Sequence, residues 1–230
     1  MSDSLTCERD GDVAILRLDD GKANALSPDL IASVSDALRR AGDEAGAVVL
    51  TGRPGRFSAG FDLSVLKAGA DAGRELVTAG AELAVQVARH PTPVVLACTG
   101  HALAMGAVLL CAGDQRIGTS GDFKIGFNEV AIGMTAPLFL LEFAADRLSK
   151  RHLQRATIQA EIYGPDTAVD AGFLDAVVGP DDLLPTALAH AQKLAQLPRG
   201  AYVNTRARVR GATLERIEAT LAEDMASAFA

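Results

Sequence analysis

One apolar stretch, residues 93–137, constrains the fold of this 230-residue chain more than any other segment. It begins with Val94–Cys98, a run of apolar and β-branched residues that is typical of a short buried strand. A threonine and a glycine interrupt the run, and Ala104-Met105-Gly106 then opens an apolar segment long enough for a core helix. A strand, a glycine-containing turn and a helix N-terminus leave backbone N–H groups free for a ligand. The stretch therefore predicts a binding site lined by main chain.

The same stretch places one carboxylate, Glu129, among apolar neighbours. The sequence FKIGFNEVAIGM around it follows a second apolar strand, which we expect over Arg116–Thr119. Burying a charged carboxylate costs free energy, so such a residue either forms a structural ion pair or serves a function. The residues alone leave both interpretations of Glu129 open.

Composition and charge favour some classes of protein and argue against others. A hydrophobic fraction of 49% and a charged fraction of 22% are typical of a soluble globular protein, and 230 residues can bury one substantial core. No apolar run reaches the ~18 residues of a membrane helix, and the first residues lack the features of a secretion signal. A net charge of −7 argues against nucleic acid as a partner. The three cysteines are odd in number and widely spaced, which favours reduced thiols and a cytoplasmic location.

Alternating strand-like and helix-like segments predict an α/β fold. Asp10-Gly11-Asp12 separates the first two strands and is typical of a hairpin turn. Ser27-Pro28 combines a capping residue with proline at the first helical position. The expected strands outside the central stretch are Leu5–Arg9, Val13–Leu18, Ala47–Leu50 and Val177–Val178. The expected helical regions are residues 28–41, 63–90, 137–148, 150–159, 166–171, 181–197 and 213–229.

The last of these helices carries Leu214, Ile217, Leu221 and Met225 at helical spacing. No later predicted element covers this apolar face. We therefore expect the helix to pack at a subunit interface or against a neighbouring core, in a homotrimer or a hexamer.

Several other kinds of site fit the sequence poorly. Ser58 does not match the nucleophile-elbow pattern, and no order of His and Asp supports a catalytic triad. Residues 100–106 lack the GxGxxG spacing of a dinucleotide-binding loop. His101 lies in a turn where a histidine is more often packed than catalytic. Cys98 and Cys111 have no metal-ligand spacing, so we expect them in the core.

Five segments, taken in order, resemble a known family. They are NALSPDL, LTGRPGRFSAGFDL, PVVLACTGHALAMGAVLLCAGD, NEVAIGMTAP and IYGPDTAVDAGFLDAVV. Together they are similar to the successive signatures of the crotonase family, the enoyl-CoA hydratase/isomerase superfamily. Pattern alone would predict a doubly wound sheet, whereas the resemblance implies a crotonase-like spiral of stacked ββα units over residues 1–195. It also implies that residues 196–230 form a C-terminal helical segment for oligomerisation.

The resemblance implies an enzyme that acts on acyl-CoA thioesters and stabilises an enolate of the thioester. An oxyanion hole stabilises the charge that develops on the carbonyl oxygen. By resemblance, the hole consists of the backbone N–H groups of Phe61 and Met105. Family members often have glycines where this chain has Ala104-Met105-Gly106. Met105 is therefore compatible with the hole if its side chain points away from it.

The catalytic base implied by the resemblance is Glu129. Hydratases of the family use two glutamates, and Val108 occupies the position of the second one here. The segment GFNEVAIG is closer to the Δ3,Δ2-enoyl-CoA isomerases, which keep a single glutamate that moves a proton between C2 and C4. The resemblance therefore favours an isomerase. Two alternatives stay open: a hydratase with a non-standard second acid, and an acyl-CoA-binding protein without activity.

The resemblance also assigns acyl-CoA contacts to the turn at residues 23–26 and the loop at residues 58–63. Lys22, Arg53 and Arg56 are candidates for binding the CoA phosphates. No metal or redox cofactor is implied, because coenzyme A is part of the substrate, and we expect neither nucleic acid nor a membrane as partner. The candidate substrate-binding residues are Lys22, Ala23, Ala25, Leu26, Ser58, Ala59, Gly60, Asp62, Leu63 and Gly106.

Overall fold

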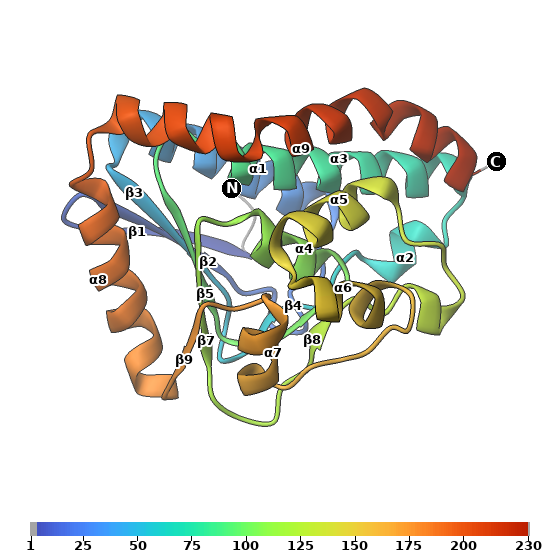
Figure 1. The fold of residues 1–230 in the computed structure, drawn as a ribbon, viewed down its shortest axis with the longest axis horizontal. Coiled ribbons are helices and arrows are strands. Elements are labelled where there is room, and N and C mark those ends of the chain that lie inside the picture. Colours follow the sequence, from blue (N-terminus) through green and yellow to red (C-terminus); the bar gives the residue numbers. More distant parts are fainter. Residues whose placement is uncertain (1–3, 230) are drawn as a thin grey trace.

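The computed structural model describes residues 4–229, which form two sheets surrounded by helices (Figure 1). The larger sheet has the strand order β1-β2-β3-β5-β7-β9 and is parallel except for the β1–β2 pair. Its strands are Leu5–Asp10, Val13–Leu18, Ala47–Thr51, Val94–Cys98, Gln115–Thr119 and Ala176–Val178. The smaller, parallel sheet has the order β4-β6-β8, with strands Gly55–Ser58, Gly100–Leu103 and Ile125–Gly126. The prediction of an α/β fold is confirmed.

Three strands of the larger sheet each lead into one strand of the smaller sheet. β3 is followed by β4, β5 by β6 and β7 by β8, and helical structure follows each pair. The chain thus advances by one ββα unit at a time, and neighbouring units pair in both sheets. This is the spiral that the family resemblance implies, and it replaces the doubly wound sheet that pattern alone predicts.

The smaller sheet is not predicted from sequence because its strands are short and contain glycine. β8 has only two residues, and the register of β4 shifts between Arg56 and Ser58. Gly100, at the start of β6, has a φ of 157°. A Cβ on Gly100 would lie 2.2 Å from the carbonyl carbon of Gly55 in β4. The glycine that interrupts the apolar run therefore permits a close approach of two strands.

Local signals determine the N-terminal unit. β1 and β2 form an antiparallel hairpin around Gly11, whose φ of 56° lies in the left-handed region. The helix α1, Pro28–Glu44, begins where the sequence predicts. The Ser27 side chain accepts a hydrogen bond from Leu30 N, and Pro28 lies in the first turn. Both predictions are confirmed.

Helices cover both faces of the larger sheet. On one face, α8 (Leu183–Ala195) packs against alternate strand residues, among them Val49 and Val95. On the other face, Val48 and Leu50 join the main core together with α1 and with α3 (Ala70–Ala88). Strands that are buried on both faces have continuous apolar runs, as the sequence shows for these segments.

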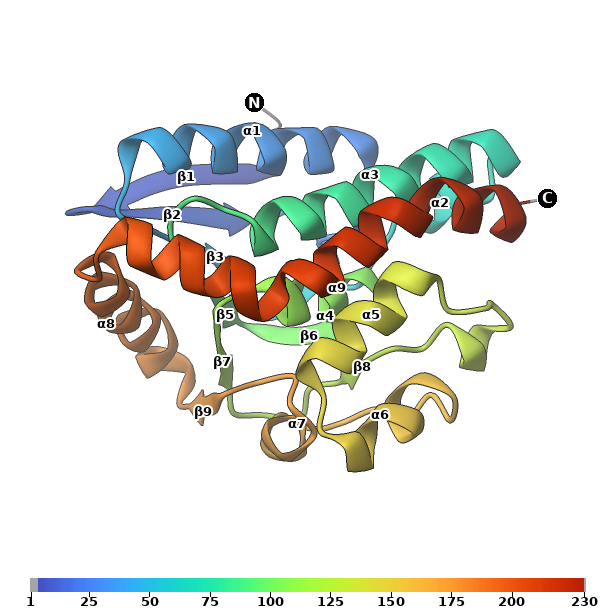
Figure 2. The same ribbon diagram turned by 45° about the horizontal axis from the view of Figure 1, so that its top comes forward.

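The longest helix, α9, spans Arg199–Ala228 and lies across α3 and α5 (Figure 2). Apolar spacing predicts a start at residue 213, but the helix begins at Arg199. Leu214, Ile217 and Met225 are buried against the core of the same chain. Because the chain itself covers this face, the face no longer supports a subunit interface, and assembly stays a prediction. The other helices are α2 (Leu63–Leu66), α4 (Met105–Ala112), α5 (Leu138–Arg147), α6 (Lys150–Thr157) and α7 (Pro165–Ala171).

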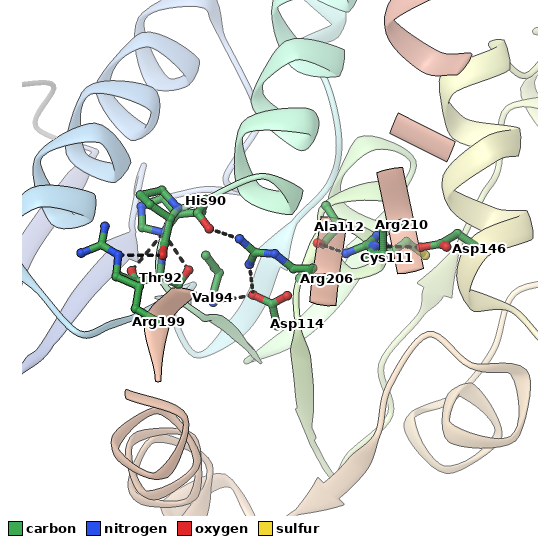
Figure 3. Close-up of polar contacts among 12 residues, drawn as sticks. His90, Thr92, Val94, Cys111, Ala112, Asp114, Asp146, Arg199, Arg206 and Arg210 are labelled. Atoms are coloured by element: carbon green, nitrogen blue, oxygen red, sulfur yellow. Dashed lines mark hydrogen bonds and ion pairs between the residues drawn. The ribbon is translucent and has the colours of Figure 1, made fainter. Parts of the chain in front are cut away.

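Arginines hold the first half of α9 in place (Figure 3). Arg206 donates to an Asp114 carboxylate oxygen at 2.9 Å and to the carbonyl of His90. Arg210 donates to Asp146 at 2.8 Å and to two carbonyls at the C-terminal end of α4. These polar contacts replace an apolar stripe, which explains why apolar spacing does not predict this half of the helix.

The three cysteines are free thiols. Cys98 and Cys111 are buried in the core, as predicted, and Cys7 is exposed. Burial raises the pKa of both buried thiols. None of the helices in the described part of the chain is long and apolar enough to cross a membrane.

Candidate active site

A cavity of about 160 Å³ lies where α2, α3 and α4 meet the segment after β8. Phe61, Met105 and Glu129, the three predicted catalytic residues, all line it. Its walls are otherwise mostly apolar, and within residues 4–229 Glu129 is the one lining residue that ionises. The structure therefore brings the predicted catalytic residues together around one cavity.

Two glycines bring the loop after β4 against the N-terminus of α4. A Cβ on Gly60, whose φ is 92°, would lie 2.9 Å from Ala104 Cβ and 3.3 Å from Met105 N. A Cβ on Gly106 would lie 2.4 Å from the carbonyl oxygen of Ser58. Residues without a side chain permit this approach. It places the amides of residues 61 and 105 at the same end of the cavity.

The N–H groups of Phe61 and Met105 have no hydrogen-bond acceptor within residues 4–229. The backbone on either side of Phe61 is used, because Leu26 N donates to Gly60 O at 2.8 Å and Asp62 N donates to Leu26 O at 3.1 Å. Met105 is the first residue of α4, where N–H groups have no partner inside the helix. Two free N–H donors beside an apolar cavity are what an oxyanion hole requires.

The Met105 side chain packs between α3 and α4. It is 1% exposed, and its Sδ lies beside Gly80 of α3, next to the Phe61 ring. Ala104 precedes it with a φ of 50° and a ψ of −122°, a conformation that residues with a Cβ rarely adopt. The chain therefore keeps the backbone turn for which glycine is suited, at a cost in strain.

Asn24 fixes the turn at residues 23–26 against the end of β4. Its φ is 51°, its side chain is fully buried, and its Nδ2 lies 3.0 to 3.1 Å from three carbonyl oxygens of β2 and β4. Sequence reasoning did not assign Asn24 a role. The available signal was its residue type, since asparagine tolerates a positive φ better than most residues.

Ser58 is held inside this loop. Its hydroxyl donates to Asn24 O at 2.8 Å and accepts from Gly60 N at 3.2 Å. The first contact ties the loop to the turn at residues 23–26, the second lies within the loop, and the side chain is buried. These contacts leave the hydroxyl engaged, so it is not available as a nucleophile.

Glu129 lines the cavity just before the short 3-10 turn η1, Val130–Ile132. The residue is 8% exposed, and its Oε2 has no hydrogen-bond partner in the described part of the chain. Burial raises the pKa of the Glu129 carboxyl above its ordinary value of 4.5, against a smaller opposing effect of the N–H groups of Glu129 and Asn128. A buried carboxyl without a cationic partner is typical of a proton-transfer site rather than a structural ion pair.

Two other residues of the cavity, Val108 and Asn128, bear on the chemistry open to Glu129. Val108 of α4 is fully buried and lines the same cavity, so no second carboxyl is present at this position. Asn128 also lines the cavity, and its buried Oδ1 has no partner among residues 4–229. Sequence reasoning missed Asn128, whose only signal was its place beside Glu129.

The model of the enoyl-CoA hydratase/isomerase family matches residues 8–228 of the chain. The chain belongs to this family. It is 32% identical over 214 residues to the probable enoyl-CoA hydratase echA17 of Mycobacterium avium, covering 87% of this chain and 79% of that protein. The structure of an enoyl-CoA hydratase/isomerase family protein from Pseudomonas syringae has a TM-score of 0.96 at 42% identity and covers 98% of both chains.

Names of both activities occur among these family members. The structure of an enoyl-CoA isomerase from Mycobacterium tuberculosis has a TM-score of 0.93 at 38% identity and covers 99% of both chains. The same protein is described as a probable enoyl-CoA hydratase in another solved structure. The comparisons therefore identify a crotonase-family enzyme without deciding between isomerase and hydratase.

The residues predicted to bind CoA phosphates in this crotonase-family enzyme lie outside the cavity. Arg53 Nη1 donates to Lys22 O at 2.7 Å, and its Nε lies 3.4 Å from the Asp19 carboxylate. Arg56 lies near His101, whose pKa is lowered by burial first and then by the charges of Arg56 and Lys124. Their contact with CoA stays a prediction.

The other predicted contacts divide into two groups. Ala59 and Leu63 line the cavity. Asp62 instead caps α2, because its Oδ1 accepts from Ser64 N at 2.8 Å and from Ser64 Oγ at 2.6 Å. The hydroxyl of Ser64 is the main cause of the lowered pKa of Asp62. Ala23 O accepts from Ala59 N at 3.0 Å, so the turn and the loop that the family resemblance assigns to acyl-CoA are neighbours.

The cavity opens to solvent through an apolar rim. Leu63, Ile132 and Met134 line it although they are 57%, 54% and 39% exposed. Large apolar side chains exposed as a group mark a binding surface. This rim suits the apolar part of a ligand.

A larger groove of about 500 Å³ lies between α8 and α9 and shares no lining residue with the cavity. Its charged groups are already engaged, since Arg206 pairs with Asp114 and Arg210 with Asp146. We therefore place the candidate active site in the smaller cavity.

Proposed function

We propose that this enzyme is an enoyl-CoA isomerase, which moves a double bond of an acyl-CoA thioester from C3 to C2. The observation that supports the proposal is the composition of the cavity. Glu129 is its one ionisable lining residue within residues 4–229, and it shares the cavity with the free N–H groups of Phe61 and Met105. Isomerisation needs one group that removes and returns a proton, whereas the family's hydratases use two glutamates to activate water.

In the proposed reaction, the Glu129 carboxylate removes a proton from C2 of a 3-enoyl-CoA. The electron pair of the C–H bond moves into an enolate, and the N–H groups of Phe61 and Met105 stabilise the negative charge on the thioester oxygen. The protonated Glu129 then donates to C4 while the double bond forms between C2 and C3. The carboxylate is regenerated, no proton is gained or lost, and the reaction requires no metal or redox cofactor.

The raised pKa of Glu129 supports this role. A general base is most effective when its pKa lies near the operating pH, and burial moves the carboxyl in that direction. The same burial makes the protonated form a better-populated donor for the second half of the reaction.

Hydration is the second candidate, because the probable hydratase from Mycobacterium avium aligns with most of the chain. In that reaction the unpartnered Oδ1 of Asn128 would accept a hydrogen bond from the attacking water while Glu129 acts as base. We favour isomerisation because the Asn128 amide cannot donate a proton as the second glutamate of the hydratases does, and Val108 occupies the position of that glutamate.

We further propose that the enzyme assembles as a homotrimer or hexamer in a reducing compartment such as the cytoplasm. The family resemblance supports the assembly, and three free thiols support the compartment. Light scattering at micromolar concentration should give the mass of three or six subunits. A monomer would contradict the assembly proposal.

Isotope transfer tests the proposed isomerisation. A 3-enoyl-CoA that carries deuterium at C2 is converted in ordinary water, and the product is analysed by mass spectrometry and NMR. Because one shielded carboxylate moves the label, we expect deuterium at C4 of part of the product. Complete loss of the label to solvent, with turnover intact, would contradict direct transfer between C2 and C4 by the buried Glu129 carboxyl.

A further inference from the structure

Gly80 of α3 lies directly behind the Phe61 ring. A Cβ on Gly80 would lie 2.3 Å from Cε1 and 2.4 Å from Cζ of Phe61, and 3.6 Å from Sδ of Met105. The first two distances are too short for any real contact, so a side chain at this position must displace the ring. Glycine is unfavourable inside a helix, and its place within α3 therefore calls for a packing reason.

The two side chains that pack against Gly80 are those of Phe61 and Met105, whose N–H groups form the proposed oxyanion hole. Phe61 and Met105 both line the cavity, and so does Val77, which precedes Gly80 by one turn on the same face of α3. Gly80 is itself buried. The absence of a side chain at this position thus determines how closely the Phe61 ring and the Met105 thioether approach the backbone of α3.

We propose that Gly80 is a specificity-determining residue that sets the length of acyl chain the cavity accepts. The inference rests on the proposed function, because it assigns the space in front of Phe61 and Met105 to an apolar acyl chain. A methyl group at position 80 moves the ring away from α3 and into that space. The enzyme then loses room for long acyl chains but keeps room for short ones.

Gly73 provides a matched control on the same helix. It lies seven residues before Gly80, is also buried, and also packs under an aromatic ring. A Cβ on Gly73 would lie 2.6 Å from Cε1 of Phe229. Neither Gly73 nor Phe229 lines the cavity. Gly73→Ala therefore reproduces the strain of ring displacement without a change at the acyl site.

The experiment measures binding of saturated butyryl-, octanoyl- and dodecanoyl-CoA to the full chain by calorimetry. We expect Gly80→Ala to weaken dodecanoyl-CoA binding by about tenfold relative to butyryl-CoA, as the loss of burial for roughly two methylene groups predicts. Gly73→Ala should leave the ratio of the two affinities unchanged. Met105→Ala, which keeps the backbone donor and removes the thioether, should shift the ratio toward the longer chain.

Each outcome decides the proposal. An equal loss of affinity for all three chain lengths in Gly80→Ala would overturn it, as would a profile that matches Gly73→Ala. Thermal unfolding shows whether each variant folds. If Gly80→Ala does not fold, an unchanged ratio of dodecanoyl-CoA to butyryl-CoA affinity in Met105→Ala overturns the proposal. A wild-type protein that binds acyl-CoA but converts no enoyl-CoA contradicts the proposed function and leaves this test valid. A protein that binds none of the three contradicts both.

Discussion

Val108 and Glu129 line the same cavity, and of the two only Glu129 carries a group that can transfer a proton. Val108 is fully buried in α4, whereas the Glu129 carboxyl is buried without a cationic partner within residues 4–229. The two residues bear on whether this enzyme catalyses isomerisation or hydration. One acid beside the proposed oxyanion hole is sufficient for a proton shuttle and insufficient for the two-glutamate activation of water.

The first prediction concerns the role of Glu129 as base. Glu129→Gln keeps the shape of the side chain and removes its proton transfer. We expect isomerase turnover to fall by at least ~100-fold while acyl-CoA binding persists, since general-base catalysis contributes about that factor. Steady-state kinetics and calorimetry provide the two readouts. A loss smaller than about tenfold in a folded protein would show that Glu129 is not the base.

The second prediction links the pKa of Glu129 to stability. The folded state raises this pKa above the ordinary value of 4.5, so the folded state binds the proton more tightly than the unfolded chain does. Stability contributed by Glu129 is therefore present at low pH and is lost as pH rises through the raised pKa. Glu129→Gln should unfold at a higher temperature than the wild type near neutral pH, with the difference vanishing below the ordinary value. Equal melting temperatures at every pH would contradict the raised pKa.

The third prediction tests what Val108 excludes. Val108→Glu places a carboxyl in α4 beside the proposed oxyanion hole, where it can assist water addition. We expect the ratio of crotonyl-CoA hydration to isomerisation to rise, at a cost of a few kcal/mol in stability because a buried carboxyl loses hydration. Val108→Gln is the matched control, with similar size and no acid. If both variants change the ratio of hydration to isomerisation equally, a missing acid at position 108 is not what limits hydration in the wild type.

The fourth prediction concerns Ala104, the strained residue before the proposed oxyanion-hole donor Met105. Ala104→Gly relieves a φ of 50° that a Cβ disfavours, so we expect the free energy of unfolding to rise by about 1 kcal/mol. Ala107→Gly, in the regular part of the same helix, should instead lose about 1 kcal/mol or more. Urea unfolding of both variants gives the comparison. Destabilisation by Ala104→Gly of the same size as in Ala107→Gly would show that the conformation carries no strain.

Local signals make part of this fold predictable. The hairpin around Gly11, the Ser27 cap of α1 and the apolar helix that begins at Met105 depend on neighbours in sequence, and all three are confirmed. The isolation of Glu129 in an apolar segment is likewise a local signal; the structure places Glu129 in the cavity wall, and its role as base stays a prediction.

Other features depend on contacts that no local pattern contains. The smaller sheet requires Gly100 to meet Gly55 across the spiral, and the first half of α9 depends on Arg206 reaching Asp114. In sequence, Gly80 only weakens the prediction of a helix, whereas in the fold the Phe61 ring occupies the space of its missing side chain. In each case a distant segment supplies the physical reason for the residue.

Isomerase and hydratase activity can be compared directly by giving two substrates to one enzyme preparation. Turnover of a 3-enoyl-CoA and hydration of crotonyl-CoA are measured at saturating concentration and the same pH. We predict isomerisation on the order of 10 per second or faster, with hydration at least ~100-fold slower. Hydration of crotonyl-CoA on the order of 10 per second or faster, with slow conversion of the 3-enoyl-CoA, would contradict it.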